Sequence, residues 1–211
     1  MDIVNMQPYP VAMTDKPSYH HGNLREALIS AAFDLLDREG VDAVTIRAVA
    51  RAIGVAHSAP ANHFKTRKDL LTALATRTFE QLIAAIQEGL DQGAGERREK
   101  LKVFADAVIV FGLTHPNRYR LLWRKDCLTS EDPHLLAQMD LLYEPLIELF
   151  EEGNQTAHRS SETSGIALWS LVHGYVSLRL DGNLVPLKDE VSGEPRERAI
   201  VDALFDGIAP S

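Results

Sequence analysis

Residues 45–64 read TIRAVARAIGVAHSAPANHF, and the expected fold follows from this stretch. Apolar residues recur at helical spacing over residues 46–52, and Thr45 stands where it can cap that helix. Gly54 ends this helix and begins a tight turn, after which residues 57–63 predict a second short helix. Two short helices joined by a tight turn form a helix-turn-helix, whose second helix fits the major groove of DNA.

The segments on both sides of this motif also have the apolar spacing of helices. No run of residues alternates convincingly at period two, so we expect an all-α fold with about nine helices and no sheet. Asn23 and Gly40 bound the helix before the motif, and Thr66 caps the helix after it. The expected helices cover residues 23–39, 46–52, 57–63, 67–90, 97–115, 117–125, 133–155, 160–181 and 194–208.

These elements predict three regions of different character. Residues 1–18 hold three prolines and little periodicity, which predicts a flexible N-terminal tail. Residues 19–66 contain three expected helices, including the helix-turn-helix, and form a small DNA-binding domain. Residues 67–211 contain the remaining helices and form a larger helical domain.

Composition narrows the class of protein further. The chain has 211 residues, of which 45% are hydrophobic and 25% charged, as in ordinary globular proteins. Cys127 is the single cysteine, so an intrachain disulfide is excluded. No apolar run is long enough for a membrane span, and the N-terminus lacks the pattern of a secretory signal. We therefore expect a cytoplasmic protein that does not associate with membranes.

Motifs for catalysis and for resident cofactors are absent from the sequence. There is no P-loop, no dinucleotide-binding glycine pattern, no zinc-protease motif and no nucleophile elbow. His20 and His21 are adjacent, and adjacent residues rarely bind one metal ion, so no metal site is expected. The prediction is a protein without enzymatic activity, cofactor or metal.

Charge is distributed unevenly along the chain. The net charge is −8, yet residues 15–78 carry nine basic and seven acidic residues. Residues 79–211 carry 13 basic and 22 acidic residues. Such asymmetry is typical of a nucleic-acid-binding part joined to another part, because affinity for DNA depends on local neutralisation of phosphates.

At this point the sequence resembles a known family. Residues 24–75, LREALISAAFDLLDREGVDAVTIRAVARAIGVAHSAPANHFKTRKDLLTALA, are similar to the DNA-binding domain of TetR/AcrR-family transcriptional regulators. Gly40, Thr45 and Phe64 are among the positions in register with that family. Residues 19–25 and the form HSAPANHF resemble one subgroup, whose C-terminal domain carries a Trp-His-Gly signature. Residues 169–174, WSLVHG, supply that signature here.

The resemblance implies eight positions that contact DNA. Base-facing positions are His57, Ser58 and Ala59, and positions near the phosphate backbone are Thr45, Arg47, Asn62, His63 and Arg67. One departure concerns Ala61, because the family commonly has an aromatic residue there that packs on the DNA backbone. Alanine cannot make that contact, so affinity or operator preference is expected to differ from the family norm.

The resemblance also implies a small-molecule effector and a homodimer for the larger domain. Aromatic side chains are the candidates for the effector pocket, with core packing as the alternative: Phe104, Phe111, Tyr119, Trp123, Tyr143, Trp169 and His173. The last two helices are expected to pair with their symmetry mates in a four-helix bundle. Candidate interface residues are Ile166, Val172, Val176, Ile200, Leu204 and Ile208. The acidic charge of this half favours a cationic or neutral effector over an anionic one.

The predicted function is transcriptional repression by a homodimer that binds a palindromic operator in double-stranded DNA. An effector would favour a spacing of the two recognition helices that does not fit the operator, with the helix from Arg67 as the lever. Two alternatives from other classes remain open. One is a helical small-molecule-binding protein or enzyme whose helix-turn-helix no longer binds DNA, and the other is an adaptor that binds a protein partner through this motif.

Overall fold

The computed structural model describes residues 24–93, 95–151 and 160–207. Within these ranges the chain forms eight α-helices and two short 3-10 helices, with no β-strand, which confirms the all-α prediction. The predicted tail 1–18, the pair His20 and His21, the proposed cap Asn23 and the interface candidate Ile208 lie outside the described residues.

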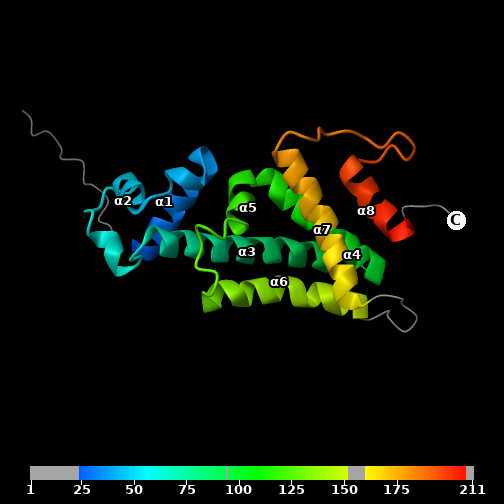
Figure 1. The fold of residues 1–211 in the computed structure, drawn as a ribbon, viewed down its shortest axis with the longest axis horizontal. Helices are drawn as coiled ribbons and strands as arrows, with labels where there is room; N and C mark the ends of the chain where they lie inside the picture. The colour runs from blue at the N-terminus through cyan, green and yellow to red at the C-terminus, as the bar shows by residue number, and fades with distance from the viewer. Residues whose placement is uncertain (1–23, 94, 152–159, 208–211) are drawn as a thin grey trace, which may run out of the picture.

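Four short elements gather at one end of the molecule (Figure 1). They are α1 (Leu24–Glu39), the 3-10 helix η2 (Val41–Ala43), α2 (Ile46–Ala52) and the 3-10 helix η3 (Ala59–Asn62). The α2 helix begins where the sequence predicts, because the Thr45 Oγ1 accepts a hydrogen bond of 3.1 Å from the Ala48 N–H. Gly40 has a φ of 82°, which favours glycine and lets the chain leave α1 sharply.

The second helix of the motif is shorter and tighter than predicted. We expected a helix over residues 57–63, and the structure has a single 3-10 turn over Ala59–Asn62 after a turn at residues 57–58. Pro60 explains the difference, because proline has no N–H to donate and disfavours helical backbone in the residue before it. Three 3-10-type bonds form here, from the Ala59 N–H to the Ala56 carbonyl, from the Ala61 N–H to the Ser58 carbonyl and from the His63 N–H to the Pro60 carbonyl.

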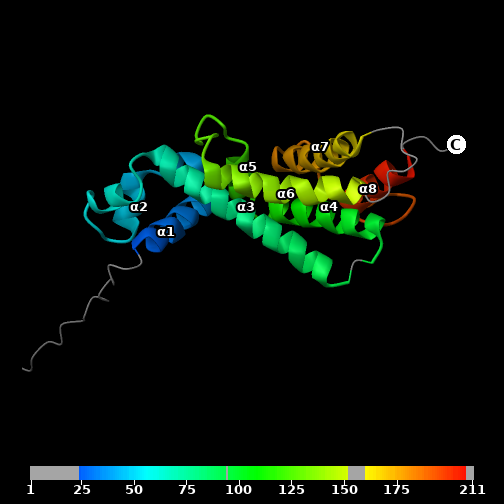
Figure 2. The same ribbon diagram turned by 90° about the horizontal axis from the view of Figure 1, so that it is seen from below.

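Six further α-helices form the rest of the molecule. They are α3 (Arg67–Asp91), α4 (Arg97–Thr114), α5 (Pro116–Leu122), α6 (Pro133–Glu151), α7 (Ser161–Leu180) and α8 (Arg196–Asp206). The α3 helix has 25 residues and extends from the helix-turn-helix end along much of the larger domain (Figures 1 and 2). Thr66 and Asp69 form a capping box at its start, as the position of Thr66 predicts. This helix therefore belongs to both parts of the molecule.

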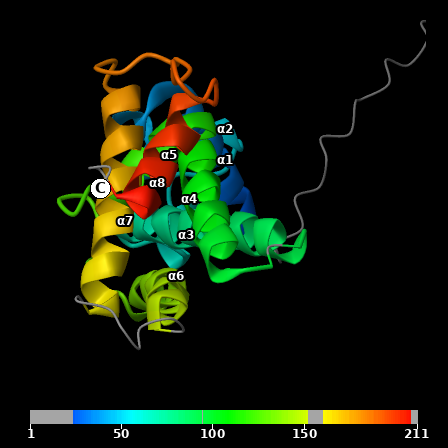
Figure 3. The ribbon, with the colours of Figure 1, turned by 90° about the vertical axis from the view of Figure 1, so that its right-hand side faces the viewer.

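One hydrophobic core runs from α1 to α8. Phe79 and Leu82 of α3 are almost completely buried in it. Gly112 of α4 allows α7 to approach closely, since a Cβ at this position would lie 2.6 Å from the Val176 Cγ1. The view along the long axis shows α6, α7 and α8 around the end of the bundle far from α2 (Figure 3). A continuous core of this kind can transmit a shift in the larger domain to the helix-turn-helix.

Candidate nucleic-acid surface and ligand cavity

The predicted DNA-contacting residues lie mainly on the surface of the helix-turn-helix end. Six of the eight are exposed, and Ala59 and Arg67 are half-buried. The buried members of the motif are Val49 and Ala50 of α2 together with Pro60 of η3, which hold the two short helices against α1. The surface is therefore free to meet a partner, and the contacts themselves remain predictions.

Four basic side chains on this surface have no acidic partner within the described residues. Arg47 and Arg51 lie on α2, Lys65 precedes α3 and Lys68 lies in its first turn, and all four are exposed. None of them forms an ion pair or a side-chain hydrogen bond in the described part of the chain. Such cations are free to neutralise phosphates. The site prediction omitted Arg51, Lys65 and Lys68, although the run of basic residues from 65 to 68 was a signal for two of them.

The Arg67 side chain forms hydrogen bonds within the protein. Its Nε donates to the Val44 carbonyl at 2.7 Å and its Nη2 donates to the Val41 carbonyl at 2.6 Å. Asp42 lies 3.8 Å from the same Nη2. These contacts tie the segment after α1 to the start of α3. A phosphate contact from Arg67 stays a prediction, but its neighbour Lys68 is the side chain that points to solvent.

We expect Arg67→Ala to destabilise the protein and Lys68→Ala to leave its stability unchanged. The first change leaves two half-buried carbonyls without their charged donor, which costs about 2–3 kcal/mol, whereas an exposed lysine contributes within about 0.5 kcal/mol. Urea unfolding followed by circular dichroism compares the two variants. Equal unfolding midpoints would contradict the structural role of Arg67.

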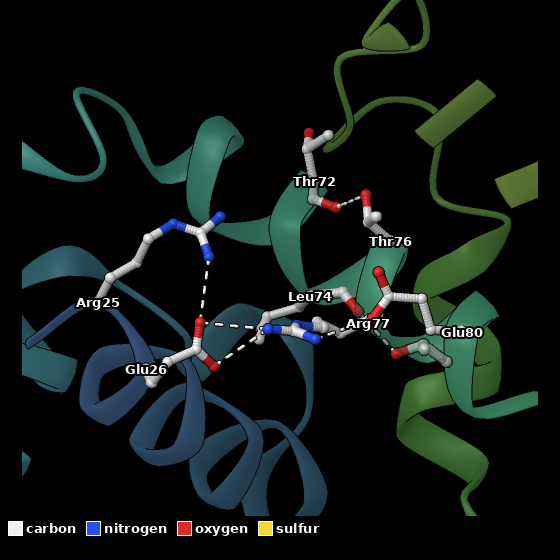
Figure 4. Close-up of polar contacts among 8 residues, drawn as sticks. Arg25, Glu26, Thr72, Leu74, Thr76, Arg77 and Glu80 are labelled. Carbon is white, nitrogen blue, oxygen red and sulfur yellow. Dashed lines mark hydrogen bonds and ion pairs between the residues drawn. The ribbon is translucent and has the colours of Figure 1, made fainter. Parts of the chain in front are cut away.

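A polar network joins α1 to α3 beside this surface (Figure 4). Arg77 of α3 donates to both carboxylate oxygens of Glu26 on α1 at 3.2 Å, and to Glu80 one turn further along α3 at 3.1 Å. Arg25 lies 3.4 Å from Glu26 and stacks its guanidinium over the ring of Phe64, which precedes α3. These groups are about half exposed, so they link α1 to α3 but contribute little stability.

A second and more buried set of contacts joins α5 to α1 and α3. The Arg118 guanidinium donates to both carboxylate oxygens of Asp37 on α1 and to the Gln81 side chain on α3, at 2.5 to 3.2 Å. It also stacks over the Phe33 ring at 4.5 Å, and its side chain is only 18% exposed. The adjacent Asn117 donates to the Asp37 carbonyl at 3.0 Å. The C-terminal end of α1 is thus bound to α5.

Six of the seven predicted pocket residues form one aromatic cluster. Trp123 is at its centre, with ring centroids 5.7 Å from Tyr119, 5.5 Å from Trp169 and 4.7 Å from His173. Trp169 extends the cluster to Tyr143 at 5.1 Å and to Phe104 at 6.4 Å. Phe111 lies apart from the cluster, and its ring contacts His115 at 5.0 Å.

A cavity of about 300 Å³ opens beside part of this cluster. Tyr119, Trp123 and His173 line it, and Phe104 instead borders a void of about 70 Å³ between α3 and α6. Tyr143 and Trp169 do not line this cavity, in agreement with the alternative of core packing. The further lining residues are Val41, Asn117, Arg120, Arg124, Ser177, Leu180 and Asp181. Since Val41 belongs to η2, the cavity touches both parts of the molecule.

Hydrogen bonding determines which groups face the cavity. The Tyr119 hydroxyl lies 2.8 Å from the His173 Nδ1. Burial raises the pKa of the Tyr119 phenol and lowers the pKa of the His173 imidazole, so both are neutral near pH 7. The direction of this hydrogen bond depends on the His173 tautomer: with the ring proton on Nε2 the Tyr119 hydroxyl donates to Nδ1, and with the proton on Nδ1 it accepts.

The predicted dimer interface needs a correction. Val172 and Val176 are completely buried within the protomer, so they contribute no surface to an interface and this part of the prediction was wrong. Ile166 is 56% exposed, and Ile200 and Leu204 of α8 are half-buried. The exposed face of α7 also includes Leu178 at 45% and Gly174, whose Cβ would meet nothing within 4 Å. The α7 helix is apolar on two faces, so the helical period alone did not distinguish the buried face from the exposed one.

Metal and membrane sites are not evident in the described part of the chain. No group of three or more histidine, cysteine, aspartate or glutamate side chains there is arranged to hold a metal ion. Among the described helices, none combines the length and the apolar character that crossing a bilayer requires.

Two families match the chain, one over each part of the fold. The family described as "Bacterial regulatory proteins, tetR family" matches residues 28–74. The family described as "Tetracyclin repressor-like, C-terminal domain" matches residues 101–204. The first match contains the helix-turn-helix, and the second contains the aromatic cluster and every residue that lines the cavity except Val41.

Individual relatives agree with these matches. An uncharacterized HTH-type transcriptional regulator of Mycobacterium tuberculosis, Rv0681, is 30% identical over 163 residues, which is 75% of this chain and 71% of that protein. A protein of unknown function from Rhodococcus sp. RHA1 has a TM-score of 0.74 and 26% identity, covering 90% of this chain and 96% of that one. PfmR, a TetR family transcriptional regulator of Thermus thermophilus, shares the fold with a TM-score of 0.63 and 18% identity, covering 89% of this chain and 98% of that one.

Proposed function

The chain belongs to the TetR family of bacterial regulatory proteins and is a DNA-binding transcriptional regulator, and on this premise we propose that it is a homodimeric repressor. It would bind a palindromic operator and release it when a small molecule fills the cavity beside Trp123 and His173. Residues 19–66 would act as the DNA-binding domain and residues 67–211 as the effector-binding and dimerisation domain. Its place of action would be the cytoplasm, and it would have no enzymatic activity.

One observation supports the proposed DNA-binding surface. The exposed cations Arg47, Arg51, Lys65 and Lys68 lack acidic partners within the described residues, although the chain as a whole is acidic. Elsewhere most arginines are paired, as Arg77 is with Glu26. Unpaired cations around an exposed helix-turn-helix are the charge distribution expected of a protein that binds DNA.

The α5 helix supports a route from the cavity to the DNA-binding surface. Asn117 and Arg118 hold the end of α1, and Tyr119 on the same short helix and Trp123 directly after it line the cavity. A ligand that displaces α5 would therefore move α1 relative to α3. In a dimer this movement would change the distance between the two recognition elements, and a spacing that misfits the operator would lower its affinity.

The exposed face of α7 supports the homodimer. Ile166 and Leu178 are exposed apolar residues on this helix, and Gly174 between them allows close approach of a second helix. A two-fold interface uses the same patch on both copies, so one helix face is sufficient to form it.

We expect Gly174→Glu to convert the dimer into a monomer. A Cβ at this position meets nothing within 4 Å in its own protomer, but the glutamate would place an unpaired carboxylate in the interface of both copies, weakening dimerisation at least about a hundredfold. Light scattering after size-exclusion chromatography at micromolar concentration measures the mass. Val110→Glu is the matched control, because Val110 is 60% exposed on α4 and should leave the dimer intact. A dimeric Gly174→Glu variant, or a monomeric wild type, would exclude this interface.

The salt dependence of DNA binding tests the proposed function against the alternatives. We expect the logarithm of the affinity for duplex DNA to fall linearly with the logarithm of the salt concentration, by roughly 0.9 for each phosphate contacted. Fluorescence anisotropy of a labelled mixed-sequence duplex measures this slope. The absence of binding by the folded dimer at low salt would favour a helical small-molecule-binding protein whose helix-turn-helix has lost its use on DNA.

A further inference from the structure

The groups that face the cavity are mainly hydrogen-bond donors. The His173 Nε2 has no partner within the described residues, and it carries the ring proton in the tautomer in which Tyr119 donates to Nδ1. Arg120 and Arg124 line the same cavity. The acceptors among the lining side chains are fewer, and Asp181 is the single carboxylate among them. A ligand that supplies acceptors would complement this lining.

Trp123 adds a donor that the protein leaves unsatisfied. Its Nε1 is buried and has no acceptor within the described part of the chain. A buried N–H without a partner costs free energy, and such groups are rare in folded proteins. This N–H is not exposed at the cavity surface, so an acceptor reaches it only if the indole shifts when a ligand binds.

The walls and the size of the cavity restrict the body of the ligand. Tyr119 and Trp123 supply aromatic surface and Val41 and Leu180 supply aliphatic surface. A volume of about 300 Å³ lies at the lower end of the range for small-molecule sites, which suits a compound of one or two rings. Flat rings pack on such walls edge-to-face or offset, as the protein's own rings already do.

The charge of the lining differs from the charge of the whole domain. Two guanidinium groups and one carboxylate line the cavity, whereas residues 79–211 are strongly acidic. Arg120 is paired with Asp181 at 3.5 Å, and Arg124 is paired with Asp126 at 2.8 Å. Both arginines are about half exposed, so their charges remain available to an incoming anion. Counted with Asp126, the two arginines and two aspartates around the cavity balance in charge, so the strong negative charge of the domain does not extend to it and an anion or a neutral acceptor is not repelled there, unlike the expectation from overall composition.

We propose that this cavity binds a small aromatic carboxylate, with its ring against Tyr119 and Trp123 and its carboxylate toward Arg120, Arg124 and His173. The inference rests on the proposed function, because it assigns the chemical class of the effector to the site that was proposed to receive one. Binding of the ring beside Val41 would bring the ligand into direct contact with the helix-turn-helix end of the molecule.

The test uses the two tryptophan indole N–H signals of the full-length protein. Trp123 and Trp169 are the only tryptophans, so a nitrogen–proton correlation spectrum has two indole signals, and Trp169→Phe assigns them. We expect 1-naphthoate to shift the Trp123 signal with saturation. 1-Naphthylmethylamine has similar rings and the opposite charge, and it should bind at least about tenfold more weakly because charge-assisted hydrogen bonds are lost.

Variants of Arg120 and Arg124 test the role of the ligand's carboxylate. Arg120→Gln combined with Arg124→Gln should reduce the affinity for 1-naphthoate about tenfold or more and leave that for neutral 1-naphthamide nearly unchanged. Arg97→Gln combined with Lys188→Gln is the control, since these exposed residues do not line the cavity. Equal binding of the amine and the carboxylate would overturn the proposal, as would no shift of the Trp123 signal at millimolar 1-naphthoate.

A separate measurement distinguishes failure of the proposed ligand class from failure of the proposed function. The same samples are assayed for binding to duplex DNA by anisotropy, with and without 1-naphthoate. DNA binding without any naphthoate binding would overturn the ligand class and leave the regulator intact. Naphthoate binding by a protein that does not bind DNA would support the site and contradict the proposed function.

Discussion

Replacing Arg47, Lys65 and Lys68 together by glutamine is expected to weaken DNA binding about a hundredfold near ~150 mM salt, by the electrostatic contribution of three phosphate contacts. The slope of log affinity against log salt should become less steep by about 2.7 for the same reason. These side chains are exposed and have no partner in the described part of the chain, so the loss should not come from unfolding.

The matched control removes three positive charges elsewhere. Arg97, Lys100 and Lys188 lie outside the helix-turn-helix and form no ion pair within the described residues. Replacing them by glutamine changes the net charge equally and should alter DNA affinity only slightly. Fluorescence anisotropy at several salt concentrations compares the two triple variants, and thermal unfolding checks that both remain folded. If both variants lost the same affinity, net charge rather than this surface would govern DNA binding.

Arg118→Ala is expected to be the most damaging single change at the junction between α5 and α1. It removes hydrogen bonds to Asp37 and Gln81 and the stacking over Phe33, in a side chain that is only 18% exposed. Loss of these contacts should lower the free energy of unfolding by about 2–4 kcal/mol, which urea denaturation measures.

The same change should also uncouple the cavity from the DNA. The variant is expected to retain ligand binding at Trp123, because Arg118 does not line the cavity, while ligand no longer alters DNA affinity. Arg77→Ala is the comparison, since its network also joins two helices but is about half exposed and should cost less than about 1 kcal/mol. An Arg118→Ala variant with unchanged stability and unchanged coupling would remove α5 from the proposed route.

The local features of the fold were predictable from sequence, because they depend on neighbouring residues alone. Thr45 and Thr66 cap helices where their positions predict, and the helical spacing gives the order of the elements. The shortened recognition element also has a local cause in Pro60, yet its effect on helix length was underestimated. Sequence pattern was sufficient here for fold class and for the location of the DNA-binding motif.

The direction of individual side chains was less predictable, because it depends on contacts distant in sequence. Arg67 and Lys68 are adjacent cations, and only the carbonyls of Val41 and Val44 explain why the first points inward. The α7 helix presents apolar residues on two faces, so burial of Val172 and exposure of Leu178 required the packing of neighbouring helices. For the same reason, sequence predicted the aromatic residues of the cluster but not which three border the cavity.

Selection of duplexes from a random pool tests the central claim most directly. The wild-type protein is incubated with the pool at ~100–150 mM salt, and the recovered duplexes are sequenced. The proposed two-fold dimer predicts a palindrome whose half-sites are separated by about one helical turn or slightly more. Recovery of no sequence above background, by a protein shown to be folded and dimeric and tested with and without 1-naphthoate, would contradict the account.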